Sequence, residues 1–260
     1  MIEKNILEKT ITIIVPCYNE ERNIIKTIRK IKKSKYYKKF KIEILIVDDG
    51  STDNTLSIIK KLQLKNIRFF SNKKNMGIGY SFFNYAKYSR NNYITLIPGD
   101  GENDLDQTLN YVNLLDSVDI IIPFIVNQKK QRTLVRTLLS RLYNFIVNFS
   151  FGVKLNYTNG TVIFNKNILE NIKVSSNSFF YQTEFLISLI RQGYLYAEVP
   201  HFLNKRLLGK SKAVTIMSFI RVVLDFIKFF LKVHFIRSSG RNLKHFNKKS
   251  ITYLRKKNDK

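Results

Sequence analysis

The sequence has very little cysteine: Cys17 is the single one among 260 residues. One thiol excludes a disulfide within the chain and a zinc site built from cysteines. A reducing, cytoplasmic setting fits this cysteine usage best. The first residues include Glu3 and Glu8 and lead straight into a strand-like segment. We therefore expect no signal peptide at this end.

Several sequence motifs of common enzyme classes are also missing. There is no G-x-x-x-x-G-K-[ST] phosphate loop, and no G-x-G-x-x-G follows the first strand-like segment. The G-x-S-x-G elbow of a hydrolase is absent as well. The three histidines, His201, His234 and His245, lie far along the chain from the acidic segment described below. These absences argue against a Ser-His-Asp hydrolase and against the common kinds of kinase.

Acidic residues are few, and the formal net charge is +26. Such a charge suits nucleic acid, an anionic membrane surface or a phosphorylated substrate. The run from Lys26 to Lys41 has basic residues around several faces of a helix-like segment, and we interpret it as solvated surface. A non-catalytic protein that binds nucleic acid is one alternative, but the chain has no recognisable nucleic-acid-binding motif. We therefore expect no nucleic acid partner.

Strand-like and helix-like segments alternate through the first hundred residues. The apolar, largely β-branched runs are typical of parallel strands covered on both faces. The expected strands are Thr10–Val15, Ile42–Val47, Ile67–Phe70 and Tyr93–Ile97, and the expected helices are Glu20–Tyr36, Thr52–Leu62 and Met76–Arg90. This succession predicts an α/β fold with a doubly wound, mostly parallel sheet and right-handed crossovers.

Unusual residues follow each of the four expected strands. The segments are Pro16–Glu20, Asp48–Ser51, Asn72–Gly77 and Pro98–Glu102. In sheets of this kind, ligands bind beyond the carboxyl ends of the strands. We therefore expect these four loops to converge on one site.

The fourth of these loops carries three carboxylates at alternate positions, Asp100, Glu102 and Asp104. Packed carboxylates repel one another and require water or a cation. A divalent cation such as Mg²⁺ typically uses one or two carboxylates together with substrate phosphates. The pattern predicts a metal site, and the alternative is a solvated acidic turn after a strand.

Taken together, the segments TIIVPCYNEERNI, ILIVDDGSTDNT, NMGIGYSF and LIPGDGE resemble the family-2 glycosyltransferases. The resemblance extends over about residues 10 to 213, toward the polyprenyl-phosphate (dolichyl-phosphate) branch of that family. Later segments that carry it are QRTLVRTLLSRLYN, YTNGTVIF and the closing basic segment NKRLLGKSKA. It implies the type-A, Rossmann-like nucleotide-sugar-binding fold and a hexosyltransferase activity similar to dolichyl-phosphate mannosyltransferase.

The resemblance also implies roles for individual residues. Asp48 would receive the base or the ribose, because a carboxylate accepts hydrogen bonds from hydroxyl and N–H groups. Asp100 and Glu102 would bind Mg²⁺ or Mn²⁺, with Asp104 as an additional ligand, and the metal would bridge the donor diphosphate. Arg206 would contact that diphosphate and take part in catalysis. The remaining residues expected to bind the nucleotide sugar are Pro16, Tyr18, Glu20, Asp49, Gly77, Asp100 and Lys212.

Arg132, Arg136, Ser140 and Asn144 recur at four-residue steps, so they form one stripe of a helix. Arginine forks suit phosphate, and we expect Arg132, Arg136 and Ser140 to hold an acceptor phosphate, with Arg136 also catalytic. A phosphate nucleophile is already an anion, so no general base is needed. The alternative is an ordinary amphipathic helix with solvated arginines.

The segment from Ala213 to Ile236 is very apolar, but no uncharged run in it approaches the length of a membrane span. Its charges fall on one stripe, Arg221, Asp225, Lys228 and Lys232, at steps of 4, 3 and 4 residues. The opposite side is apolar and includes Phe219, Val222, Val223, Phe226, Phe230 and Val233. Together with the basic tail, this pattern predicts a helix lying on an anionic membrane surface. A helix docked on the protein's own core, or pairing two subunits, is the alternative.

These observations lead to one main prediction. Residues 1–212 form a catalytic domain that moves a sugar from a nucleotide diphosphate to a polyprenyl phosphate, and residues 213–260 form a membrane-associating extension. The enzyme would work at the cytoplasmic, inner face of the cell membrane, in the biosynthesis of a cell-envelope glycan. The alternative acceptor is a growing surface glycan. The sequence does not indicate which sugar, base or metal is used.

Overall fold

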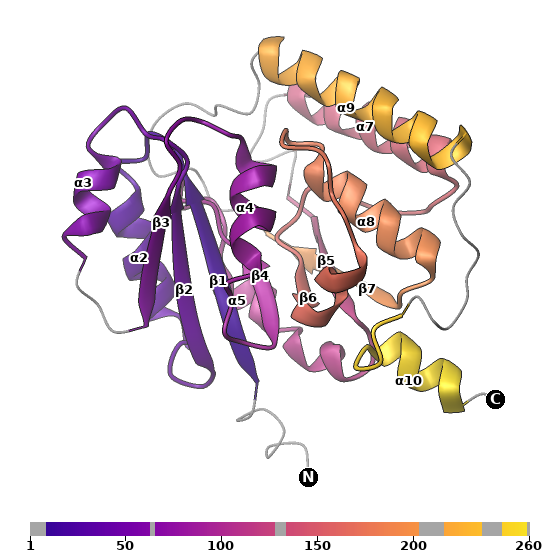
Figure 1. Ribbon diagram of the computed structural model, residues 1–260, viewed down its shortest axis with the longest axis horizontal. Helices are drawn as coiled ribbons and strands as arrows, with labels where there is room; N and C mark the ends of the chain where they lie inside the picture. The colour runs from indigo at the N-terminus through magenta and orange to yellow at the C-terminus, as the bar shows by residue number, and fades with distance from the viewer. Residues whose placement is uncertain (1–8, 63–65, 128–133, 203–215, 236–245, 259–260) are drawn as a thin grey trace.

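The structure, a computed structural model, describes residues 9–62, 66–127, 134–202, 216–235 and 246–258. One sheet of seven strands, in the order β3-β2-β1-β4-β6-β5-β7, forms its centre (Figure 1). Every pairing is parallel except those of β6, which is antiparallel to β4 and β5. The strands are β1 (Thr10–Cys17), β2 (Lys41–Asp48), β3 (Ile67–Ser71), β4 (Tyr93–Leu96), β5 (Ile120–Ile125), β6 (Ile163–Asn165) and β7 (Tyr196–His201). The predicted doubly wound, mostly parallel sheet is confirmed.

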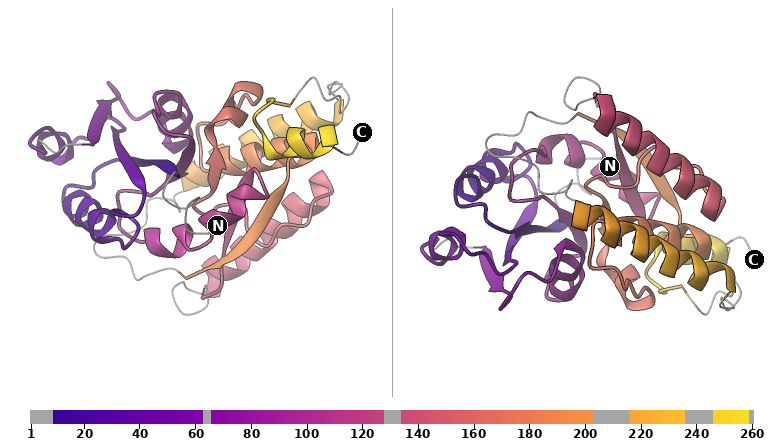
Figure 2. Two further views of the ribbon diagram at one scale, coloured as in Figure 1. Left: turned by 90° about the horizontal axis from the view of Figure 1, so that it is seen from below. Right: turned by 90° about the horizontal axis from the view of Figure 1, so that it is seen from above.

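Helices cover both faces of this sheet, as the view from below in Figure 2 shows. On one face lie α2 (Ile24–Lys33), α3 (Thr55–Lys60), α5 (Leu105–Leu109) and the 3-10 helix η1 (Val112–Asp116). On the other lie α4 (Ile78–Ala86), α7 (Leu134–Phe151), α8 (Tyr181–Gln192), α9 (Ile216–Phe235), α10 (Ile251–Asn258) and the 3-10 helix η2 (Lys166–Asn171). This two-sided cover explains why β1 and β2 are apolar on both faces.

Alternate residues of the central strands point into two separate cores. Ile11, Ile13 and Val15 pack toward α2, whereas Ile14 and the β2 residues Leu45 and Val47 pack toward α4 and α8. Since successive side chains of a strand point to opposite faces, a continuous β-branched run fills both cores at once.

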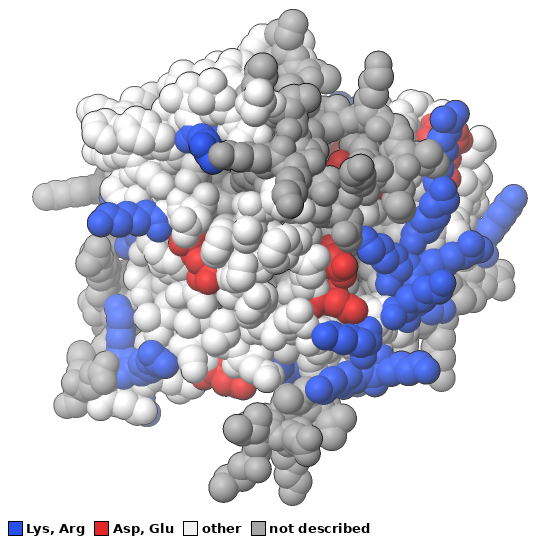
Figure 3. Space-filling model, turned by 180° about the vertical axis from the view of Figure 1, so that it is seen from behind, with Lys and Arg blue, Asp and Glu red and all other residues white. Residues whose placement is uncertain are grey.

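The basic run around α2 is on the surface, as predicted. Arg22, Lys26, Arg29, Lys32 and Lys33 are all exposed, while Ile24, Ile28 and Ile31 of the same segment are buried. Figure 3 shows Lys and Arg side chains gathered on the side of the molecule that carries α2. The upper left of that view, over α7, shows few charged side chains. The basic residues around α2 are therefore well separated from α7.

Helix α9 does not have the simple two-sided arrangement that the sequence predicted. Phe226 and Phe230, expected on the membrane-facing side, contact the core through Phe151 at the end of α7. Phe229 is buried against the same ring and against Phe180. A separate apolar stripe stays exposed, and it comprises Met217, Ile220, Val223, Leu224, Ile227, Leu231 and Phe235. The helix therefore both docks on the core and presents an uncovered apolar surface.

None of the helices in the described ranges is long and apolar enough to cross a membrane. Helix α10 packs near the sheet, where the backbone N–H groups of Ile251 and Thr252 donate to the buried carboxylate of Asp119 at 2.7 and 3.0 Å. The predicted domain boundary after residue 212 falls outside the described residues and stays a prediction.

The docking of α9 can be tested with two phenylalanines of the same helix. Phe229→Ala leaves a cavity between α9, α7 and α8, so we expect it to lower the free energy of unfolding by about 3–5 kcal/mol. Phe219 is 65% exposed, so Phe219→Ala should change it by less than about 0.5 kcal/mol. Urea unfolding monitored by circular dichroism measures both. Equal effects of the two substitutions would contradict this orientation of the helix.

Candidate active site

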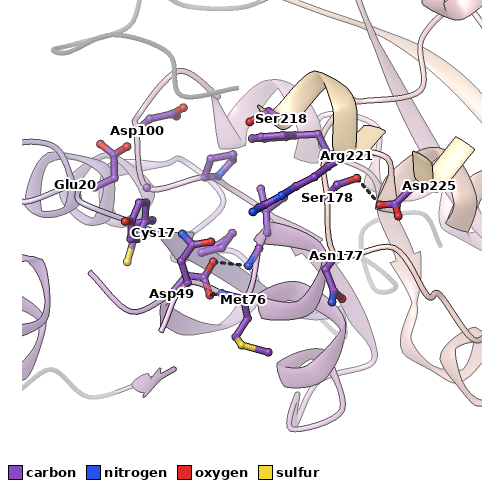
Figure 4. A pocket seen from close by; sticks show the side chains of 18 of the residues that line it. Cys17, Glu20, Asp49, Met76, Asp100, Asn177, Ser178, Ser218, Arg221 and Asp225 are labelled. Atoms are coloured by element: carbon purple, nitrogen blue, oxygen red, sulfur yellow. Dashed lines mark hydrogen bonds between the residues drawn. The ribbon is translucent and has the colours of Figure 1, made fainter. Parts of the chain in front are cut away.

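A cavity of about 830 Å³ lies at the carboxyl ends of β1, β2 and β4, and we call it the main cavity. Its volume is within the range of about 300–1,000 Å³ that is usual for small-molecule sites. Loops after the strands form one wall, and residues 175–179 and helix α9 form the other (Figure 4). The polar side chains that line it are Tyr18, Glu20, Asp49, Asn75, Asp100, Ser175, Asn177, Ser178, Ser218, Arg221, Asp225 and Lys228. All four predicted loops contribute lining residues, and the second contributes Asp49.

The loop after β1 is held in place by the loop after β2. Asn19 adopts a positive φ of 53°; its N–H donates to the hydroxyl of Ser51 at 2.9 Å and its side-chain oxygen accepts from the N–H of Thr52 at 2.7 Å. The N–H of Glu20 donates to the hydroxyl of Thr55 at 2.8 Å. These contacts position Pro16, Tyr18 and Glu20, three of the predicted nucleotide-sugar ligands, along the cavity.

Asp49 organises the third loop. Its buried carboxylate accepts hydrogen bonds from the N–H groups of Met76 and Gly77, at 3.0 and 2.9 Å, and from the side-chain amide of Asn72 at 2.7 Å. Gly77 has a φ of 96°, and a Cβ there would lie 2.3 Å from the carbonyl oxygen of Asn177. Glycine is therefore required at position 77 both for its backbone conformation and for the close approach of the two walls.

Asp48 is buried beside this site but is not among the residues that line it. One of its oxygens accepts long hydrogen bonds from Ser71, at 3.2 Å, and from the N–H of Ser51, at 3.4 Å. Its other oxygen, Oδ1, is buried and has no hydrogen-bond partner within the described part of the chain. An unsatisfied buried carboxylate oxygen is unfavourable for folding and is a feature expected of a group that receives a ligand.

The electrostatic character of this wall is negative. Burial, followed by the nearby carboxylates of Asp48 and Glu20, raises the pKa of the Cys17 thiol well above its usual value. The thiol donates to the carbonyl oxygen of Val47 and remains protonated. Cys17 is therefore a small packing residue here, because only a thiolate would act as a nucleophile.

Of the three carboxylates in the acidic loop, Asp100 is the one that lines the main cavity. Gly99 is anchored by its N–H to the carbonyl of Pro16, at 3.0 Å, and by its own carbonyl to the hydroxyl of Thr27, at 2.8 Å. The N–H of Glu102 donates to Asp100 at 3.1 Å, but the Glu102 side chain is not among the cavity-lining ones. The loop thus places a single carboxylate in the main cavity.

Asp104, predicted as a third metal ligand, caps helix α5 by accepting from the N–H of Asp106 at 3.0 Å. Among the described residues, no three His, Cys, Asp or Glu side chains are grouped closely enough to hold a metal ion. The assignment of Asp100 and Glu102 as metal ligands, with Asp104 as an additional one, therefore stays a prediction. A capping aspartate stabilises the start of the helix, and that use explains the acidic residue at this position.

Two further carboxylates fix the opposite wall. Glu184 is buried and accepts from the N–H groups of Ser175 and Ser176, at 3.1 and 2.8 Å, and from the Ser175 hydroxyl. Asp225 of α9 accepts from the hydroxyls of Ser176 and Ser178, each at 2.6 Å. These hydrogen bonds hold the loop of residues 175–178 against helix α9.

Of the three predicted acceptor residues, only Ser140 has a side chain within the described part of the chain. Arg132, Arg206 and Lys212 lie outside the described residues, and so does the side chain of Arg136, although its backbone belongs to α7. Ser140 lines a second cavity, of about 960 Å³, between α7 and the ends of β5 and β7. The structure therefore places Ser140 away from Asp49 and Asp100.

Sequence reasoning missed several residues of the main cavity. The sequence pattern places Arg221 and Lys228 on a helix that lies on a membrane surface. It does not single out four other lining residues, Ser175, Asn177, Ser178 and Ser218. The signal that could have found the first two was their shared stripe with Asp225, since charges in an otherwise apolar helix need a polar environment. The serines carried no such signal.

Known proteins resemble this chain in sequence and in fold. The family model of glycosyl transferase family 2 matches residues 12–173. A polyprenol monophosphomannose synthase of Mycolicibacterium smegmatis is 25% identical over 216 residues, which are 77% of this chain and 79% of that protein. A dolichyl-phosphate beta-glucosyltransferase of Trichomonas vaginalis is 31% identical over 103 residues, which are 37% of this chain but only 31% of that protein.

Solved structures show the same fold. A glucosyl-3-phosphoglycerate synthase from Mycobacterium tuberculosis, in complex with Mn²⁺, uridine diphosphate and glucosyl-3-phosphoglycerate, has a TM-score of 0.63 at 16% identity. The match covers 89% of this chain and 82% of that one. The same protein with Mg²⁺ and uridine diphosphate has a TM-score of 0.64.

The contrast between Asp48 and Asp49 gives a test of this site. Asp49→Asn places an amide where two backbone N–H groups require an acceptor, so we expect a loss of about 1–3 kcal/mol in the free energy of unfolding. Asp48→Asn removes a buried charge whose Oδ1 has no partner in the described ranges, so the free energy of unfolding should be unchanged or higher. Chemical denaturation of both variants measures this. Destabilisation by Asp48→Asn equal to that by Asp49→Asn would contradict the difference between their surroundings.

Proposed function

The chain belongs to glycosyl transferase family 2, and from this premise we propose that it moves a sugar from a nucleoside-diphosphate donor to a polyprenyl phosphate. The observation that carries the proposal is the main cavity, in which Glu20, Asp49 and Asp100 face Arg221 and Lys228. The wall with the carboxylates suits a nucleotide bound through a metal ion. The wall with Arg221 and Lys228 suits an anion. Relatives named for dolichyl-phosphate and polyprenol monophosphate chemistry support the choice of acceptor.

The nucleoside of the donor would bind at the first two loops. Oδ1 of Asp48, which has no hydrogen-bond partner among the described residues, can accept a hydrogen bond from a ribose hydroxyl or a base N–H. Pro16, Tyr18 and Glu20 line the adjacent part of the cavity. Uridine diphosphate in the similar solved structures supports a nucleoside diphosphate as the donor.

The residues present fit a divalent cation that is shared with the substrate. Asp100 is the carboxylate aimed at the cavity (Figure 4), and Mg²⁺ in particular uses few protein ligands and several phosphate or water oxygens. The cation would neutralise charge on the departing diphosphate. Mn²⁺ and Mg²⁺ in the similar solved structures support either metal. Glu102 remains a candidate second ligand because it adjoins Asp100 in the same turn.

The reaction itself needs no general base from the protein. A phosphate oxygen of the acceptor attacks the anomeric carbon of the sugar, the bond from that carbon to the β-phosphate breaks, and the nucleoside diphosphate leaves with the electron pair. Attack opposite the leaving group inverts the anomeric configuration. The chain's part is to hold the two anions in line and to compensate their charge. Predicted contributions of Arg136, Arg206 and Lys212 stay predictions.

The acceptor would be presented from an anionic membrane surface at the cytoplasmic face. Helix α7 exposes Leu134 (80%), Leu138 (69%) and Phe149 (83%), and α9 exposes Phe219 and Phe235. The two helices run along the same side of the molecule (Figure 1) and meet at Phe151. Exposed apolar helix faces of this kind are typical of interfacial helices.

A growing surface glycan is the alternative acceptor. The second cavity supports it, because amide and aromatic side chains gather there, among them Asn127, Asn148, Tyr157 and Phe202. A glycan acceptor would give a product that stays in the aqueous phase, whereas transfer to a polyprenyl phosphate gives an extractable lipid.

The proposed reaction predicts a metal-dependent, lipid-linked product. With radiolabelled nucleotide sugars, Mg²⁺ or Mn²⁺ and polyprenyl phosphate vesicles, we expect label in the organic phase and none when a chelator is present. Asp100→Ala should lower kcat about 100-fold or more, since it removes charge compensation of the leaving group. Glu170→Gln, at an exposed position of η2 outside the cavity lining, is the control. Label retained entirely in the aqueous phase on a glycan would overturn the lipid acceptor.

Membrane docking can be tested separately by vesicle flotation. Burying one Leu or Phe side chain contributes about 1.5–3 kcal/mol, so the double variant Leu138→Glu/Phe149→Glu should lower partitioning onto anionic vesicles at least 10-fold. Leu114→Glu changes an exposed leucine of η1, away from α7 and α9, and should leave flotation intact. Undiminished flotation of the double variant would contradict docking through α7.

A further inference from the structure

Three of the four charged residues on the stripe of α9 line the main cavity. Arg221, Asp225 and Lys228 all line the cavity, opposite Asp100 and Glu20. Figure 4 shows the guanidinium of Arg221 extending from α9 toward the loop that carries Met76. These residues follow one another at steps of 4 and 3 residues, so a single face of the helix presents them.

The members of this stripe differ in whether the fold already uses them. Asp225 accepts from two serine hydroxyls, and Lys232 lies 3.8 Å from the carboxylate of Glu184. Neither Arg221 nor Lys228 has an ion pair with any carboxylate in the described ranges. Two cations are therefore held beside the cavity by an anchored helix, with their hydrogen-bond donors available to a ligand.

The same face of α9 continues directly into exposed aliphatic surface. Leu224 lies between Arg221 and Lys228 along the helix, lines the cavity and is 50% exposed. Met217, one turn before Arg221, is 60% exposed. A ligand bound to the two cations would thus meet a hydrophobic path leading out of the cavity. This combination matches an anion carrying an apolar chain better than it matches a nucleotide, which is polar throughout.

We infer that Arg221 and Lys228 bind the phosphate of the prenyl phosphate acceptor and that Leu224 and Met217 contact the first units of its chain. This inference rests on the proposed function and adds to it the binding site of the acceptor. It assigns the acceptor to α9 and thereby differs from the sequence prediction, which gave this role to α7. The negative wall at Asp49 and Asp100 remains for the donor and its metal, so the two anionic groups have separate partners.

Soluble probes can distinguish a prenyl phosphate from a donor nucleotide or a free phosphate as the ligand of Arg221 and Lys228. Geranyl phosphate represents the acceptor, uridine diphosphate with Mn²⁺ the donor, and inorganic phosphate the head group without a chain. Arg221→Met/Lys228→Met should weaken geranyl phosphate binding, measured by calorimetry, about 10- to 100-fold, as expected for lost charge-assisted hydrogen bonds. Binding of uridine diphosphate should change less than about twofold. Leu224→Ser should weaken geranyl phosphate but leave inorganic phosphate unaffected.

Arg255→Met, on exposed α10, removes a matched positive charge outside the cavity and should leave all three affinities unchanged. Weaker uridine diphosphate binding with intact geranyl phosphate binding would show that α9 serves the donor, which overturns the inference. Unchanged affinity for both ligands overturns it as well. The proposed function fails separately, if the wild-type protein binds geranyl phosphate through Arg221 yet transfers no sugar to polyprenyl phosphate.

Discussion

The site depends on buried carboxylates that satisfy backbone N–H groups of irregular loops. Asp49 holds the Met76–Gly77 turn, and Glu184 holds the Ser175–Ser176 turn on the other side. Loops at a sheet edge cannot pair their N–H groups as strands do, and an unpaired buried N–H is costly. The two carboxylates remove that cost and hold one loop in place on each side of the main cavity. Gly77 then permits the walls to touch.

Helix α9 connects this site to the exterior. Its Asp225 binds the serines of one wall, its Phe229 fills the core, and its outer stripe stays uncovered. One helix therefore has a polar, a buried and an exposed apolar face, which is the geometry needed where an amphiphilic substrate passes from a lipid surface into an aqueous cavity. The proposed acceptor path along Leu224 follows from this arrangement of faces.

Asp48 and Asp49 show how adjacent, similarly buried residues serve different ends. Both oxygens of Asp49 accept hydrogen bonds that hold the fold, whereas Oδ1 of Asp48 has no hydrogen-bond partner among the described residues, which is unfavourable for stability. Such a loss of folding stability is expected at a functional site, where groups are preorganised for a ligand. Asp100 differs from both, because its loop brings it directly to the cavity while its neighbour Asp104 caps a helix.

The sequence by itself determined the sheet and the convergence of its loops. Continuous β-branched runs such as Thr10–Val15 can only be strands covered on both faces, and parallel strands bring their carboxyl ends to one edge. Only the tertiary structure decided which carboxylates enter the cavity and where the charges of α9 point. Asp100, Glu102 and Asp104 look equivalent along the chain, but helix capping and turn geometry separate them. Likewise, the spacing of Arg221 and Lys228 fixes their common face, whereas packing of Phe229 on Phe151 and Phe180 decides what that face meets.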